Sequence, residues 1–163
     1  MAVKPVIAGI GSPQALRDAL TGAQYIADEN LATASYLALA LSKPLLLEGA
    51  PGVGKAIGAV LSRRVVRLQC FEGIDASAAL YEWNYPRQML AIRQAGDDYV
   101  NIYGDEFLLE RPMLEALRHP QDCVLLIDEI DRADQEFEAF LLEFLSDFTI
   151  SIPETGTMRA TRQ

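Results

Sequence analysis

A glycine-rich heptad that ends in a lysine contains the residue types that hold phosphate groups. It reads Gly49-Ala50-Pro51-Gly52-Val53-Gly54-Lys55 and directly follows a short apolar run. Glycines let backbone N–H groups converge on phosphate oxygens, because no side chain blocks the approach. Lys55 would add a point charge for the β and γ phosphates, and the start of the next helix would add its partial positive charge. The alternative is a glycine-rich turn between a strand and a helix, with a solvated lysine.

Two adjacent acids, Asp128 and Glu129, follow a second apolar run at residues 124–127. The run places Asp128 at the carboxyl end of a strand, which is the edge of an open sheet where ligands bind. There Asp128 could hold a Mg²⁺ water, and Glu129 could polarise a water for in-line attack on a phosphate. Read as structure alone, the two would be solvated acids near a helix N-cap. Both motifs, in this order and each after an apolar strand, favour one shared nucleotide site.

Strands that would position these motifs alternate with helices along the chain. Residues 44–48, 65–69 and 123–127 are short, largely apolar runs, as expected of strands buried on both faces of a parallel sheet. Pro112 can start a helix at its first position, and His119-Pro120 ends it. This alternation predicts an α/β layered fold with a mostly parallel sheet.

Two further helices are expected from apolar residues at helical spacing. One runs up to residue 42, and Asn30 can cap its start. The other has Asp134 and Glu136 in its first turn, where the helix dipole favours acidic charge. Its apolar face consists of Phe137, Phe140, Leu141, Phe144 and Leu145. Residues 148–152 after it are strand-like, and residues 153–156 are turn-like.

Composition and charge narrow the class of protein. The chain has 163 residues and is 50% hydrophobic, which suits one compact domain with a core. Its net charge of -9 opposes broad electrostatic binding to nucleic acid or an anionic bilayer. Cys70 and Cys123 lack the spacing of a metal or redox site, so two buried, reduced thiols are expected. No apolar stretch is long enough for a membrane span, and we expect a cytoplasmic protein.

Four blocks of the sequence together resemble the MoxR branch of the AAA+ ATPases. The similarity runs from about Tyr25 to Ala160, and its middle two blocks are more specific than the phosphate loop. The blocks are residues 45–55 (LLLEGAPGVGK), residues 67–75 (RLQCFEGID), residues 81–85 (YEWNY) and residues 126–133 (LIDEIDRA).

The resemblance implies a three-layer P-loop NTPase core of the AAA+ type that binds ATP and Mg²⁺. Residues 49–56, from Gly49 to Ala56, would bind the nucleotide, Asp128 would position Mg²⁺, and Glu129 would be the catalytic base. Members form rings that remodel or mature client proteins, often with a partner that contains a von Willebrand factor A domain. The resemblance further implies that residues 1–163 form a single, C-terminally incomplete core, and the arginine finger and helical lid are expected beyond Gln163.

Three departures from the pattern weaken the step from binding to hydrolysis. Ala56 stands where the loop normally offers a Ser or Thr hydroxyl to Mg²⁺. The stretch from Lys55 to the next strand is short for a crossover with a helix, and Gly58 lowers its helix propensity. The third departure is the expected absence of the arginine finger. The second hypothesis is therefore a nucleotide-binding or interaction module that does not hydrolyse ATP. A phosphotransferase that uses the same loop is the third option.

Aromatic and basic residues outside the motifs have both structural and functional interpretations. Tyr81, Trp83 and Tyr85 are expected to pack in the core or at a subunit interface, with client contact as the alternative. Four arginines are candidates for contacts to a neighbouring subunit's nucleotide, although solvated or ion-paired side chains are the simpler expectation. They are Arg87, Arg93, Arg111 and Arg132.

Overall fold

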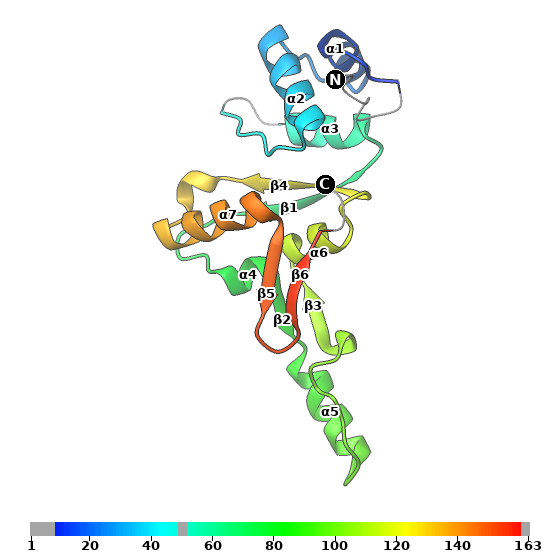
Figure 1. Ribbon diagram of the computed structural model, residues 1–163, viewed down its shortest axis with the longest axis vertical. Helices are drawn as coiled ribbons and strands as arrows, with labels where there is room; N and C mark the ends of the chain where they lie inside the picture. Colours follow the sequence, from blue (N-terminus) through cyan, green and yellow to red (C-terminus); the bar gives the residue numbers. More distant parts are fainter. Residues whose placement is uncertain (1–8, 49–51, 161–163) are drawn as a thin grey trace. The chain divides into compact units, whose positions relative to one another are not determined.

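The structure is a computed structural model that describes residues 9–48 and 52–160. The chain folds as two compact units (Figure 1). Among the described residues, the first consists of residues 9–48, 52–65 and 121–124, and the second of residues 66–120 and 125–160. Each unit has its own hydrophobic cluster, and each is described by itself.

The first unit contains three α-helices whose apolar sides meet. They are α1 (Pro13–Gly22), α2 (Glu29–Leu41) and α3 (Val53–Val60), and α1 contacts both of the others. Ser12 caps α1 by accepting a hydrogen bond from the Ala15 N–H at 3.2 Å. The buried residues of this cluster are Leu16, Leu20, Ala27, Ala56 and Ile57. Burial of these side chains supplies the driving force that holds the helices together.

The predicted helix before the glycine-rich heptad is confirmed, but its predicted cap is wrong. Asp28, not Asn30, caps α2, and its Oδ1 accepts the Leu31 N–H at 2.7 Å. An aspartate two residues earlier satisfies the same orphan N–H groups, so the helix begins at Glu29. Ser42 ends the helix in the left-handed conformation, with φ at 51°.

One strand pair is parallel, and it joins two of the strands expected from the sequence. β1 (Arg64–Gln69) and β4 (Cys123–Asp128) are neighbours in a two-stranded sheet. The Arg64 N–H donates to the Asp122 carbonyl at 3.1 Å, and the Cys70 N–H donates to the Asp128 carbonyl at 2.9 Å. In both hydrogen bonds the acceptor follows the donor by the same number of residues, so the two strands run in the same direction. The prediction that this strand is buried on both faces is wrong for β1, because only alternate residues, Val66 and Leu68, are buried.

The strand expected at residues 44–48 is also wrong. These residues form no strand, and Leu46 is 82% exposed. A strand is stabilised by hydrogen bonds to a neighbouring strand, and none of the described residues pairs with this segment. The apolar run therefore remains an irregular, mostly exposed connection between α2 and the heptad.

The second unit is built from short elements around a larger hydrophobic cluster. In chain order they are α4 (Ala76–Leu80), β2 (Tyr81–Trp83), α5 (Tyr85–Ala95), η1 (Asp105–Phe107), β3 (Leu108–Glu110), α6 (Pro112–Arg118), η2 (Ile130–Arg132), α7 (Gln135–Asp147), β5 (Thr149–Ile152) and β6 (Gly156–Arg159). β2 pairs antiparallel with β3, and β5 pairs antiparallel with β6. The helices expected after Pro112 and around Phe137 are confirmed as α6 and α7, and β5 matches the strand-like residues 148–152. No sequence pattern predicted β6.

The cluster of the second unit joins residues that are far apart in sequence. Met113 and Leu114 of α6 are fully buried, and Phe137 of α7 is 2% exposed. Trp83 lies edge-on to Tyr81 and to Tyr103, with ring centroids 6.0 Å and 5.3 Å away. Core packing is therefore confirmed for Trp83, whereas Tyr85 is 64% exposed. Both cysteines are buried as expected.

Within the described residues, the structure is mixed α/β, with one parallel strand pair and two antiparallel pairs. The larger three-layer P-loop architecture stays a prediction. None of the helices in residues 9–48 and 52–160 has the length and apolar character needed to cross a bilayer.

Candidate functional site

The glycine-rich heptad leads directly into α3. Gly49, Ala50 and Pro51 lie outside the described residues. Gly52 is the N-cap, with φ at 114°, a conformation that favours glycine over every other residue. None of the side chains that the structure describes caps this helix start. Val53 then begins the helix, so the phosphate-loop residues from Val53 to Lys55 form its first turn.

The first turn of α3 leaves backbone N–H groups available to a ligand. The first intrahelical hydrogen bond runs from the Ala56 N–H to the Gly52 carbonyl at 3.1 Å. The N–H groups of Val53, Gly54 and Lys55 come before this bond, so they have no acceptor within the helix. No acidic residue occupies this turn, and the Lys55 side chain is exposed. Five other α-helices have a Ser, Asp or Asn side chain on their N-terminal N–H groups. The start of α3 is therefore suited to an anion.

Ala56 is directed into the hydrophobic cluster of the first unit. It is 6% exposed and packs with Ile57, Leu16 and Leu20. A methyl group offers no oxygen to a cation, so this position cannot be a Mg²⁺ ligand. Ala56 can take part in nucleotide binding only through its backbone.

Gly58 explains how so short a crossover accommodates a helix. A Cβ at this position would lie 2.5 Å from Val65 Cγ2 and 3.2 Å from the Arg63 carbonyl oxygen. The helix starts at Val53, before Lys55, and Ser62 turns the chain with φ at 53°. The glycine thus permits close contact between α3 and the segment that enters β1, and this contact outweighs its low helix propensity.

Tyr25 is a neighbour of the heptad that the sequence motifs do not include. A Cβ at Gly52 would lie 3.6 Å from Tyr25 Cε2. The aromatic ring therefore borders the turn at which α3 begins. No motif spacing signals this contact, because Tyr25 precedes α2 and reaches Gly52 only through the fold.

Asp128 ends β4 as predicted, but its carboxylate already forms an ion pair with Arg67. Arg67 donates to Asp128 Oδ2 from Nε at 3.0 Å and from Nη2 at 2.6 Å. The other oxygen, Oδ1, accepts the Glu129 N–H at 3.1 Å. Arg67 lies on β1, whose parallel pairing with β4 brings the guanidinium to the acid. The sequence did not predict this ion pair, because strand register cannot be read from either segment alone.

Glu129 has a left-handed backbone, with φ at 55° and ψ at 44°. Its Oε2 lies 3.0 Å from Arg132 Nε, which is within ion-pair distance. The contact lacks hydrogen-bond geometry, and this buried oxygen has no hydrogen-bond partner. The carboxylate expected to activate water is thus partly withdrawn from solvent and faces an arginine three residues later.

The described residues do not fit a directly bound Mg²⁺. Asp128 accepts hydrogen bonds on both oxygens, Ala56 has no hydroxyl, and Glu129 faces Arg132. No group of three or more metal-binding side chains is found in the part of the chain that the structure describes. Phosphate groups, in contrast, fit the uncapped start of α3.

The two halves of the expected site fall in different units. Residues 52–56 belong to the first unit, and Asp128 and Glu129 belong to the second. Each half is defined within its own unit, and a pocket shared by both stays a prediction.

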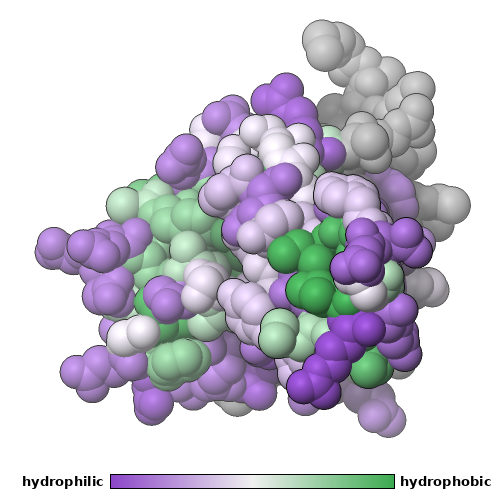
Figure 2. Space-filling view, turned by 90° about the horizontal axis from the view of Figure 1, so that it is seen from below, coloured by the Kyte–Doolittle hydropathy of each residue, from purple (hydrophilic) through white to green (hydrophobic). Residues whose placement is uncertain are grey.

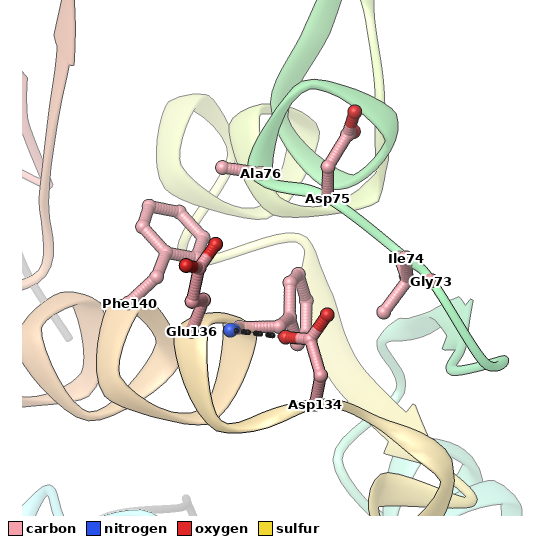
Figure 3. A pocket seen from close by; sticks show the side chains of 8 residues that line it. Gly73, Ile74, Asp75, Ala76, Asp134, Glu136 and Phe140 are labelled. Atoms are coloured by element: carbon pink, nitrogen blue, oxygen red, sulfur yellow. Dashed lines mark hydrogen bonds between the residues drawn. The ribbon is translucent and has the colours of Figure 1, made fainter.

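A separate cavity of about 310 Å³ lies in the second unit beside the start of α7. Figure 3 shows Glu136 and Phe140 on one side of it and Ala76 on the other. Asp134 caps α7 by accepting the Phe137 N–H at 2.9 Å. The remaining residues of the lining are Gly73, Ile74 and Asp75. The walls combine carboxylates with apolar side chains.

Cys70 lies close to the acids at the end of β4. The side chain is fully buried. Burial raises the pKa of the thiol above its ordinary value of 9.0, and the negative charges of Asp128, Asp131 and Glu129 raise it further. The thiol is therefore protonated at neutral pH and is a poor nucleophile.

Comparisons of the chain with models of protein families, with curated protein sequences and with solved structures found no match. The resemblance to the MoxR branch rests on the sequence blocks alone.

Proposed function

We propose that this chain binds a nucleoside triphosphate, ATP by its resemblance to MoxR ATPases, at the start of α3. The observation that carries the proposal is the uncapped first turn of α3. A left-handed Gly52 precedes it, its N–H groups precede the helical ladder, and Lys55 is exposed within it. Helix N-termini of this kind attract phosphate through the N–H groups and the helix dipole together.

An ATP titration of wild-type protein and Lys55→Ala tests the proposal. Lys55 would make a charge-assisted hydrogen bond worth about 1.5–3 kcal/mol, so its loss should weaken binding by roughly tenfold or more. Lys43→Ala is the matched control, because Lys43 is also exposed and follows the end of α2 rather than starting a helix. Absence of saturable binding by the wild type would reject the proposal, as would equal affinities of Lys55→Ala and the wild type.

Hydrolysis with Mg²⁺ held by Asp128 and water activated by Glu129 is the activity that the family resemblance suggests. Specific contacts favour the second candidate, a module that binds nucleotide without hydrolysing it. Arg67 occupies Asp128, Arg132 faces Glu129, and Ala56 replaces a hydroxyl ligand. Each of these features removes a group that phosphoryl transfer needs.

Phosphate release by the purified full chain separates the two candidates. The non-hydrolysing module should release phosphate at the background rate, and Glu129→Gln should leave that rate unchanged. A rate above background that Glu129→Gln abolishes would establish the hydrolase instead. ATP affinity is measured on the same samples, so a loss of binding is not mistaken for a loss of catalysis.

The resemblance also suggests a setting for this function. Protein clients, a partner with a von Willebrand factor A domain and a homo-oligomeric ring would accompany a MoxR-type protein in the cytoplasm. The net charge of -9 supports the expectation that nucleic acid and membrane surfaces are not partners.

A further inference from the structure

Exposed hydrophobic side chains gather on α5 and the loop that follows it. In residues 9–48 and 52–160, fourteen large hydrophobic residues are exposed, and six of them lie between residues 85 and 103. These six are Tyr85, Met89, Leu90, Ile92, Tyr99 and Tyr103. Figure 2 shows the molecule from the side on which α5 lies in Figure 1, with green hydrophobic and purple hydrophilic residues side by side at the surface. An apolar surface of this kind commonly marks an interaction site.

The orientation of α5 is fixed from its inner side. Gln88 is 5% exposed, and its Nε2 donates to the Ile102 carbonyl at 2.6 Å. With Gln88 turned inward, the helical spacing directs Met89, Leu90 and Arg93 outward. The outer face therefore combines apolar side chains with a cation.

The charge of α5 is opposite to that of the chain as a whole. Arg87 and Arg93 are its only charged residues, and the chain has a net charge of -9. Neither arginine forms an ion pair within the residues that the structure describes, unlike Arg111 and Arg132. A helix face that combines arginine with apolar side chains, in an acidic protein, suits an acidic partner surface that also has apolar groups.

α7 of the same sequence provides such a surface. Glu136, Phe140, Glu143 and Asp147 recur at helical spacing along one side of it, and α7 contains no basic residue. Its acids form no ion pair among the described residues. The cavity beside Glu136 and Phe140 adds a recess, lined by apolar side chains and carboxylates, at one end of this acidic side (Figure 3). α5 and α7 lie apart within the second unit (Figure 1), so the two faces of one unit do not cover each other.

We propose that the outer face of α5 docks on the acidic side of α7 in a second copy of this chain. Arg93 would pair with the carboxylates, and Met89 or Leu90 would enter the recess beside Phe140. The two surfaces differ, so the contact is heterologous, and every copy offers one of each. Assembly therefore continues beyond a dimer unless it closes on itself. The contact does not depend on nucleotide binding.

Sedimentation velocity of the full chain, without nucleotide, tests the contact. We expect the average mass to rise with concentration from micromolar to submillimolar, and to rise less at high salt because ion pairs are screened. A monomer at every concentration would overturn the proposal. So would an assembly that is insensitive to substitutions on α5.

Charge reversals identify the partner surface. Arg93→Glu should weaken association at least tenfold, because it replaces attraction by repulsion. Arg17→Glu is the matched control, since it makes the same charge change at an exposed position on α1. Combining Arg93→Glu with Glu143→Arg or Glu136→Arg should restore association. If neither combination restores it, or if Arg17→Glu weakens it equally, the α7 surface is not the partner.

An apolar substitution tests the contact without changing charge. Met89→Ala should weaken association several-fold, whereas Ile26→Ala, at a side chain that is 90% exposed on the first unit, should not. Equal effects of the two substitutions would overturn the assignment to α5. Circular dichroism of each variant verifies that the fold is retained.

Discussion

The start of α3 and the end of β4 were expected to share one function, yet their local chemistry is opposite. At the start of α3, backbone N–H groups and Lys55 have no protein anion to neutralise them among the described residues. At the end of β4, Asp128 already has a cation, the Arg67 guanidinium. The first region is open to a ligand, and the second is closed by a neighbour within the protein.

This difference separates binding from catalysis. Phosphate binding needs positive groups, and at the start of α3 these would be the backbone N–H groups together with the Lys55 side chain. Mg²⁺ binding and water activation need particular carboxylates that are free to act. A substitution elsewhere, such as an arginine on the adjacent strand, can remove the second property and leave the first intact.

We expect the largest effect, a loss of stability, from a substitution at Gly58, where α3 packs against the segment that enters β1. Gly58→Ala would place a Cβ 2.5 Å from Val65 Cγ2, so α3 or the entry to β1 must shift. Such overpacking costs about 1–3 kcal/mol. We expect urea denaturation to show a fall of this size in the free energy of unfolding.

Gly22→Ala is the matched control for Gly58→Ala. Gly22 ends α1, and a Cβ there would meet no described atom within 4 Å beyond its chain neighbours and the adjacent helix backbone. The same substitution there should raise the free energy of unfolding by up to about 1 kcal/mol, through helix propensity. Effects of the same sign at both glycines would show that the contact with Val65 does not limit α3.

An intermediate effect is expected at the closed region. Arg67→Gln should free Asp128 and raise the affinity of the nucleotide-free protein for Mn²⁺ roughly fivefold, because an exposed ion pair contributes at most about 1 kcal/mol. The Arg67 and Asp128 side chains are 51% and 40% exposed, so the pair belongs to this weak class. Electron paramagnetic resonance of free Mn²⁺ measures the change.

Two variants determine whether this gain comes from Asp128. Arg111→Gln breaks a similarly exposed pair with Glu82 and should leave Mn²⁺ affinity nearly unchanged. Adding Asp128→Asn to Arg67→Gln should abolish the gain. If the wild type binds Mn²⁺ as tightly as Arg67→Gln does, Arg67 does not close this region.

Local patterns in the sequence identified the elements that depend on local interactions. β1, β4, α6 and α7 were found from runs of apolar residues, from Pro112 and from the spacing of the phenylalanines. The glycine-rich heptad led to a helix start, as its motif requires. These features follow from backbone conformation and from burial of one face.

Features that depend on a distant partner were not predictable in the same way. Residues 44–48 are apolar enough for a buried strand, but a strand also needs a neighbour to complete its hydrogen bonds. The pairing of Arg67 with Asp128 depends on the register of two strands from different parts of the chain. Gly58 was expected to weaken a helix, whereas its role is to allow close packing against Val65.

We expect the smallest effect at Cys70, whose pKa reports on the negative charge at the end of β4. Burial and the carboxylates of Asp128, Asp131 and Glu129 raise the pKa of this thiol in the folded protein. The stability that the protonated thiol contributes is complete below the pKa of the unfolded thiol, which is ordinarily 9.0, and is lost as the pH rises through the higher folded pKa. The free energy of unfolding should therefore fall above about pH 9 by more in the wild type than in Cys70→Ala.

Removing one of the carboxylates tests the electrostatic part of this shift. Asp128→Asn should lower the Cys70 pKa, so the Cβ chemical shift of Cys70, followed by NMR against pH, should show a lower titration midpoint than in the wild type. The method needs no access of a reagent to the buried thiol, and separate resonances distinguish Cys70 from Cys123. Glu154→Gln is the control, because the Glu154 charge acts on Tyr81 and is not among the charges that raise the Cys70 pKa. An unchanged titration midpoint in Asp128→Asn would mean that Arg67 already cancels the Asp128 charge at the thiol. The ion pair would then neutralise Asp128 more completely than the exposure of its side chains indicates.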